Sequence, residues 1–366
     1  PFATMNRNHV IVVVQAPDDI SPKRRRIISA IVPSFLSTLE RLNAGYFRIT
    51  LSLCSQALLW KNIEESSRDF HSLRRVLRLL PPSFAVFIWS CALLTLASLS
   101  TLYLLRCVFH FEKVKSEFLH HVGVNYLFAP WISWLLLLQS SPFFSDAHGL
   151  YLYLLGAFVA PLLALDVKLY GQWFTKGKRF LFIVANPSSQ LSVIGNLVGA
   201  RAAAAMGMRE NAMCLFSLGM AHYFVLFVTL YQRHSGQKSL PAMLRPVFFL
   251  FIAAPSVASL AWGSINGGFD LPSKMLFFLS LFLFFSLACR PAMFLKSMKK
   301  FSVAWWAYSF PLTVLALSSL SYAREVKNGV AVGTMMCLTV LSAVVSFALV
   351  LLTACNAKSL VPKPNS

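Results

Sequence analysis

The chain has 366 residues, of which 57% are hydrophobic and only 13% are charged. Soluble domains average about 45–50% apolar and about 25% charged residues, so this composition argues against a soluble enzyme, a disordered chain and a disulfide-stabilised secreted domain. The 33 Lys and Arg residues outnumber the 13 Asp and Glu residues and give a net charge of +20. Such an excess is typical either of binding to a polyanion such as nucleic acid, or of basic loops beside a membrane.

Apolar runs long enough to cross about 30 Å of hydrocarbon recur at short intervals from Gly45 onward. Because a lipid-exposed backbone must satisfy its own hydrogen bonds, these runs predict helices. The sequence therefore predicts an all-α integral membrane protein with ten transmembrane helices. The predicted spans are 45–61, 83–105, 125–142, 149–166, 181–204, 211–231, 245–263, 273–289, 301–321 and 329–353.

The Lys and Arg residues are concentrated in the loops that share one side of the membrane when both termini are cytoplasmic. We therefore predict a cytoplasmic tail at 1–44, a transmembrane domain at 45–354 and a second cytoplasmic tail at 355–366. No basic soluble domain remains that would bind nucleic acid, so that partner is excluded. The basic run at 23–26 is interpreted as juxtamembrane charge, and the alternative is a stretch before Ser29 that a regulatory kinase recognises.

Proline recurs within or near the middle of alternate predicted spans, at Pro130, Pro187, Pro255 and Pro311. The spacing is about one helical hairpin, which indicates a repeated helix pair whose first member is bent; the alternative is that the spacing arises by chance. Proline opens the helical hydrogen-bond ladder, and the freed carbonyls are tolerated where they face a cavity or another helix. Most Ser, Asn and Gln residues also lie in the bent helices. We therefore expect the bent helices to line an interior and the others to face lipid or a neighbour.

Ionisable residues inside the membrane are candidate functional residues. Arg48 lies about one turn into the first predicted helix and either extends to the cytoplasmic surface or holds positive charge at the inner end of an anion path. Asp166 is expected to pair locally with Lys168, and His222 to be a hydrogen-bonded buried histidine. The membrane segments carry almost no other acidic groups, which argues against a proton-driven transporter.

The sequence contains no GxSxG, HExxH or P-loop motif, so no catalytic residue is assigned and the chain is not expected to be an enzyme. Glu117, His120 and His121 form either a metal site or, as we expect, an ordinary interfacial cluster. The seven cysteines are scattered without a CxxC motif, and we predict no metal site and no cofactor. Gly195 and Gly199 form a GxxxG motif that favours close helix packing.

The ninth predicted span begins FSVAWWAYSFP at 301–311, so that Phe310 directly precedes a proline. If this helix lines a pore, Phe310 projects to the axis and closes it sterically or by dewetting. The alternative is that Phe310 is an ordinary core residue.

Several stretches resemble the plant slow-type (S-type) anion channels, which are similar to a bacterial family of tellurite-resistance and dicarboxylate transporters. The stretches are GYF at 45–47, SQALLW at 55–60, VGVNYLFAPW at 122–131, KLYGQWF at 168–174, ANPSSQ at 185–190, SLGMAHY at 217–223, RPVFFLFIAAPS at 245–256 and FSVAWWAYSFP at 301–311. The resemblance implies five tandem hairpins, with the odd-numbered helices ringing a central pore in each subunit of a trimer. It also implies passive conduction of chloride and nitrate across the plasma membrane, and it identifies Phe310 as the gating aromatic.

The chain departs from the family pattern at Arg48, because the first-helix motif commonly reads GxFG where this sequence has GYFR at 45–48. The long cytosolic tails of the best-known members are also missing. Both features are similar to short members of the family that act chiefly as partners of other subunits. Two alternatives to a conducting channel therefore remain: a silent regulatory subunit that assembles with a conducting homologue, and a carrier for organic anions such as malate.

Overall fold

A computed structural model describes residues 36–67, 70, 81, 83–143, 148–175, 185–234, 242–295, 297–298 and 301–357. In these residues all the regular secondary structure is helical. The basic run at 23–26 and the stretch before Ser29 lie outside them.

Ten long helices follow one another as five hairpins, and each coincides with one of the predicted spans within the described residues. The hairpins are α2 (Phe47–Ser66) with α4 (Phe84–Phe109), α7 (Phe128–Gln139) with α8 (His148–Thr175), α10 (Gln190–Ala205) with α11 (Arg209–His234), α12 (Leu250–Asn266) with α13 (Leu271–Ala288), and α15 (Ser309–Val326) with α16 (Gly329–Cys355). The all-α fold of tandem hairpins is therefore confirmed.

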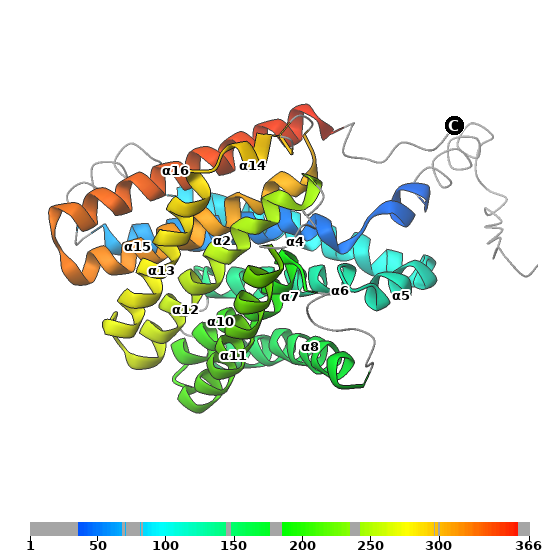
Figure 1. Cartoon of the computed structure of the whole chain (residues 1–366), viewed down its shortest axis with the longest axis horizontal. Coiled ribbons are helices and arrows are strands. Elements are labelled where there is room, and N and C mark those ends of the chain that lie inside the picture. The colour runs from blue at the N-terminus through cyan, green and yellow to red at the C-terminus, as the bar shows by residue number, and fades with distance from the viewer. Residues whose placement is uncertain are drawn as a thin grey trace, which may run out of the picture.

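The first helices of the hairpins pack into a closed ring in the described part of the chain. Each of α2, α7, α10, α12 and α15 contacts the next, and α15 returns to contact α2. The second helices pack outside the ring, so that Figure 1 shows α16 along one edge of the bundle and α8 and α11 along the opposite edge. The ring is closed because its first helix, α2, lies beside its last helix, α15.

Burial separates the two sets of helices. In the apolar segment that contains α15, 83% of the residues are buried inside the protein, against 11% in α4. Large apolar side chains such as Phe87, Leu94 and Leu104 on α4, and Phe282 on α13, remain exposed. An exposed apolar surface of this extent is stable in lipid or against another subunit. The expectation that alternate helices face outward is therefore confirmed.

Among the described residues, seven helices are long and apolar enough to cross a membrane. An eighth span results if one bent unit is counted, which joins α5 (Phe111–Leu119) to the segment Gly123–Gln139. That segment contains α6 (Gly123–Tyr126) and α7. Of the ten long helices described, those that fail this test alone are α2, α7 and α10, all members of the inner ring. Because protein rather than lipid surrounds them, they are free to be short or polar. The total of ten membrane crossings stays a prediction.

Inner helices begin with a tighter turn in the described chain. The short 3-10 elements η1 (Ala44–Tyr46), η2 (Pro187–Ser189), η3 (Ala242–Phe249) and η4 (Val303–Ala307) precede α2, α10, α12 and α15, and the short helix α6 precedes α7. One further short helix, α14 (Ala292–Leu295), follows α13. Four of the five inner helices described thus follow a 3-10 turn, and the fifth follows a short α-helix.

The prolines lie at or near these changes of geometry. Pro130 and Pro311 are each the third residue of their helix, and Pro187 is the first residue of η2. At these positions the proline has no intrahelical N–H bond to lose, so it begins a helix rather than bending its middle. Pro255 alone of the four lies in a helix interior, in α12.

Candidate pore

The N-terminal ends of the ring helices meet around a narrow space on the ring axis. The space is about 10 Å³, which holds about one water molecule. Its walls come from the described parts of all the ring's hairpins and are lined by Arg48, Leu51, Tyr126, Leu191, Val247, Leu250, Trp306, Ala307 and Phe310. The structure therefore brings two of the predicted site residues, Arg48 and Phe310, to one place.

Phe310 is the second residue of α15 and is only 1% exposed. Its helix starts where η4 ends, after Tyr308, and Pro311 occupies the next position of the first turn. The aromatic ring thus lines the small space from a backbone that the 3-10 turn and the proline both restrain.

Arg48 is folded back over the start of its own helix. Its Nε donates to the carbonyl of Gly45 at 2.8 Å, and its guanidinium carbon lies 4.7 Å from the centre of the Tyr126 ring. Its Nη1 is buried without a hydrogen bond among the described residues. The geometry therefore favours the second of the two expectations, in which the charge is held at the mouth of the axis.

Gly45 makes this conformation of Arg48 accessible. A Cβ atom at Gly45 would lie 3.0 Å from Nη2 of Arg48 and 2.8 Å from Oδ1 of Asn43. That Oδ1 accepts the N–H of Gly45 and caps the turn. Any larger side chain at this position would displace either the guanidinium or the cap.

Several buried polar side chains of α2 and α15 bond to the outer helix α16. Gln56 donates through Nε2 to Ser342 Oγ at 2.8 Å and to Ser346 Oγ at 2.7 Å, both on the outer helix α16. Ser309 contacts Ser346 at 2.6 Å and accepts a hydrogen bond from Ser52. These buried groups join the first and last ring helices to α16, and we call Ser52, Gln56, Ser309, Thr313, Ser342 and Ser346 the closing cluster.

The same outward pattern holds at α10. Asn196 donates to Asp166 on α8 at 2.7 Å, and Ser192 contacts Nδ1 of His222 on α11 at 3.1 Å. The predicted pairing of Asp166 with Lys168 is thus wrong, because the carboxylate points into the protein and Asn196 is its partner. The expectation of a hydrogen-bonded buried histidine at His222 is confirmed.

Ring residues with short side chains bring the outer helices close. A Cβ atom at Gly195 would meet Leu162 of α8 at 3.0 Å, and one at Gly199 would meet Leu215 of α11 at 3.3 Å. The GxxxG motif therefore serves packing, as expected. The small space at the N-terminal ends of the ring helices has mainly apolar walls.

Glu117 supports the N-terminal end of the ring. Its carboxylate accepts the N–H of Ala44 at 2.7 Å and pairs with Arg106 at 2.5 Å. His120 and His121 stack with their ring centres 4.6 Å apart. The carboxylate thus anchors η1 to α4, which agrees with the interfacial cluster that we expected.

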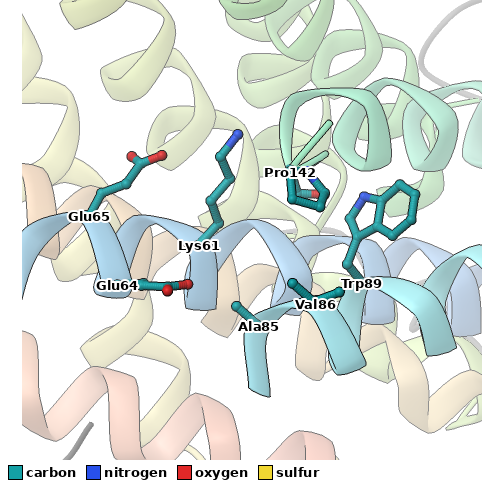
Figure 2. Close-up of a pocket in the computed structure, with 8 residues that line it drawn as sticks. Lys61, Glu64, Glu65, Ala85, Val86, Trp89 and Pro142 are labelled. Atoms are coloured by element: carbon teal, nitrogen blue, oxygen red, sulfur yellow. The ribbon is translucent and has the colours of Figure 1, made fainter. Parts of the chain in front are cut away.

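The C-terminal ends of the ring helices enclose two wider cavities, of about 320 Å³ and about 410 Å³. Arg201 and Ser264 line both cavities, so together the two form one vestibule. A further cavity, of about 520 Å³, lies off the axis between α2, α4 and the end of α7. Figure 2 shows Lys61 and Glu65 projecting from the same side of α2 beside it.

Comparison with known proteins identifies the fold and the activity class. A family model described as SLAC1, voltage-dependent anion channel, matches residues 41–357. The chain belongs to this family. It is 57% identical over 326 residues to the S-type anion channel SLAH1 of Arabidopsis thaliana, covering 89% of this chain and 84% of that protein. It is 56% identical over 327 residues to SLAH4 of the same plant, covering 89% and 87%.

The guard cell S-type anion channel SLAC1 of Arabidopsis thaliana is 44% identical over 291 residues, which is 79% of this chain and 51% of that protein. The SLAC1 family is one of anion channels and not of enzymes, so the expectation that the chain is not an enzyme is confirmed.

Reasoning from the sequence missed the vestibule at the C-terminal ends of the ring. Arg201 lies in an apolar run of the fifth predicted span, and it was passed over because nothing nearby in the sequence marks it. One signal was available, since an arginine inside a predicted span deserves the same attention as Arg48.

Proposed function

We propose that this chain is a subunit of a slow-type anion channel that conducts chloride and nitrate passively across the plant plasma membrane, with the pore closed by Phe310. The observation that supports this function best is the space of about 10 Å³ on the ring axis, where Phe310 is buried against residues from every ring hairpin that the structure describes. An apolar constriction of this size is expected to exclude a hydrated ion until the aromatic ring moves.

The direction of the ring helices favours anions at this end. Residues at the starts of α2, α10, α12 and α15 line the same small space, so these helices run in parallel. Each helix N-terminus carries about half a positive charge, which attracts anions. Arg48 adds a full positive charge at the same level. We propose that this end faces the cytoplasm, together with both chain termini.

Selection among anions follows from the apolar walls. Residues such as Leu51, Leu191, Val247 and Leu250 offer no hydrogen bond to replace water around an ion. An anion that loses its hydration at low cost therefore passes with the smaller barrier, and nitrate is expected to pass at least as readily as chloride.

Arg48 also supports a second candidate function, an electrically silent subunit. Its side chain occupies the inner mouth and is held there by Gly45 and Tyr126. In a homo-trimer or hetero-trimer with related subunits, such a chain would regulate a conducting neighbour. The exposed apolar surface of α4 and α13 is available for that assembly.

Current recording tests both functions. The chain is expressed alone, and together with a conducting S-type relative, in a cell that lacks background anion current. A current from the chain alone that reverses at the chloride potential, and shifts when nitrate replaces chloride, supports the channel. Silence alone with an altered current from the relative supports the regulatory subunit. No effect in either condition, with the chain present at the surface, would refute both.

A further inference from the structure

The vestibule at the C-terminal ends of the ring has an electrostatic problem that an anion path must overcome. Each helix C-terminus carries about half a negative charge, so the converging ends of the ring helices repel anions. Lys61 offsets part of this negative charge, because its Nζ donates hydrogen bonds to the carbonyls of Gln139 and Ser141 at 3.1 and 3.0 Å, where α7 ends.

Arg201 is placed differently from Lys61. It lines both halves of the vestibule, and among the described residues its guanidinium makes no hydrogen bond and no ion pair. An arginine has five N–H donors in a planar fork, and none of those of Arg201 is among the buried atoms that lack a partner in the described structure. The donors therefore lie open to an acceptor supplied from solution.

The neighbouring acidic groups do not fill this role. Glu65 lies near enough for its charge to act on both Arg201 and Lys61, but no ion pair joins it to either in the described structure. Glu325, across the vestibule, pairs with Lys274 at 3.8 Å. Three cationic side chains line the walls of the vestibule, namely Lys61, Arg201 and Arg324. They outnumber the acidic side chains of the same walls, which are Glu65 and Glu325.

The polar groups around Arg201 already have acceptors. Ser264 Oγ donates to the carbonyl of Leu260 at 3.0 Å, and Gln139 Nε2 to that of Leu135 at 3.2 Å. The donors left for a ligand are those of the guanidinium. A planar oxyanion matches this fork with two parallel hydrogen bonds, whereas a halide accepts from it as a point charge.

We propose that Arg201 is the centre of an anion-binding site in this vestibule, supported by Lys61, and that its ligand is a small monovalent inorganic anion, with nitrate bound more tightly than chloride. The site rests on the proposed channel function and adds to it a binding step at the mouth opposite Phe310. It offsets the helix C-termini and raises the local anion concentration where ions enter or leave the axis.

The test measures binding without requiring current. The ³⁵Cl NMR line of chloride broadens when the ion exchanges with a protein site, so line widths are recorded for the purified full chain in detergent. The variants are Arg201→Gln and Arg201→Lys. Arg209→Gln is the matched control, because Arg209 starts α11 just beyond the same helix ends, is exposed and lines neither half of the vestibule.

We expect wild-type protein to broaden the chloride line. We also expect added nitrate to abolish that broadening at a lower concentration than added chloride does. Arg201→Gln should weaken chloride binding about tenfold or more, Arg201→Lys should retain most chloride binding while losing the preference for nitrate, and Arg209→Gln should match wild type. Elution of each variant as a single species from a size-exclusion column establishes that it is folded.

Equal broadening by wild type and Arg201→Gln would overturn the site, as would equal losses in Arg201→Gln and Arg209→Gln, which would indicate diffuse surface charge. An absence of broadening in wild type would overturn it as well. Failure of the channel function is a separate result, namely normal anion binding without current from the chain alone or with a relative.

Discussion

Arg48 gives the sharpest prediction, because its charge and its bulk make opposite contributions to an anion current. If the charge matters most, Arg48→Met should lower the current since it keeps much of the length and removes the charge. If the bulk matters most, Arg48→Met should leave the current unchanged and Arg48→Gly should raise it. The structure favours charge, because Arg48 is stacked against Tyr126 at the wall of the mouth.

The size of the effect follows from Coulomb's law. For an anion about 5 Å from the guanidinium, the attraction is about 1 kcal/mol in water and about 3 kcal/mol at an effective dielectric constant of about 20. The occupancy of the mouth by an anion should therefore fall by about fivefold to about 150-fold when the charge is removed.

The stability of the fold should change little. Arg48→Met removes the hydrogen bond to Gly45 and the contact with Tyr126, together worth about 1–3 kcal/mol. It also removes the buried Nη1, whose missing hydrogen bond costs about 1–3 kcal/mol. The two effects oppose one another, so a loss of current is not expected to arise from unfolding.

The assay is whole-cell recording at low cytosolic chloride, in a chain that also carries Phe310→Ala so that the axis is open. We expect Arg48→Met to reduce the efflux current at least fivefold and Arg48→Lys to retain most of it. Lys115→Met is the control, since Lys115 is exposed on α5 at the same end of the molecule and lies off the axis. An Arg48→Met current equal to or larger than that of the parent would refute the electrostatic role.

Three further predictions follow from the contacts. Phe310→Ala alone should give a larger anion current per surface-delivered channel, although the lost packing costs about 3–5 kcal/mol, and an unchanged current in a delivered channel would contradict the gate. Gln56→Leu removes hydrogen bonds to two serines of α16 and should lower the free energy of unfolding in detergent by about 1–3 kcal/mol, measured by thermal melting, with Gln139→Leu outside the closing cluster as the control. Asp270 is partly desolvated, which raises its pKa, but hydrogen bonds from Trp262, Ser273 and Asn266 outweigh this and hold the pKa below its ordinary value. Its stabilisation is therefore present above about pH 4 and lost as pH falls through the lowered pKa. The melting temperatures of wild type and Asp270→Ala should differ at pH 7 and converge as the pH falls through the lowered pKa of Asp270, and a constant difference would contradict this reasoning.

The hairpin order could be predicted from the sequence because lipid leaves few choices. A helix in lipid must be apolar throughout, so composition alone identifies α4, α13 and α16 as membrane-spanning segments. The inner helices α2, α7 and α10 are harder, since protein surrounds them and composition no longer has to be apolar. They were still found because each predicted span contains an apolar run, although some of these runs are short or interrupted by proline.

The direction of side chains could not be predicted, because composition does not say which face of a helix meets which neighbour. Gln56 and Asn196 are polar residues on ring helices, and polarity suggested that they line the interior. Their acceptors instead lie on outer helices, at Ser342 and Asp166. Burying a polar group without a hydrogen-bond partner costs free energy, so such a group points toward its partner whether or not a pore lies nearby. Only the packed structure shows where that partner is.

The distribution of charge along the axis favours transport over tight binding. Arg48 lies at one mouth and Arg201 at the other, whereas Leu51, Leu191 and Phe310 form part of the apolar constriction beside Arg48. A cation at the middle of the membrane would hold an anion in a deep energy well, and departure would then limit the rate. Cations at the ends concentrate ions without trapping them between the mouths. Moving a charge inward, for example by Leu51→Lys three residues beyond Arg48 on α2, should therefore slow conduction even though it strengthens attraction.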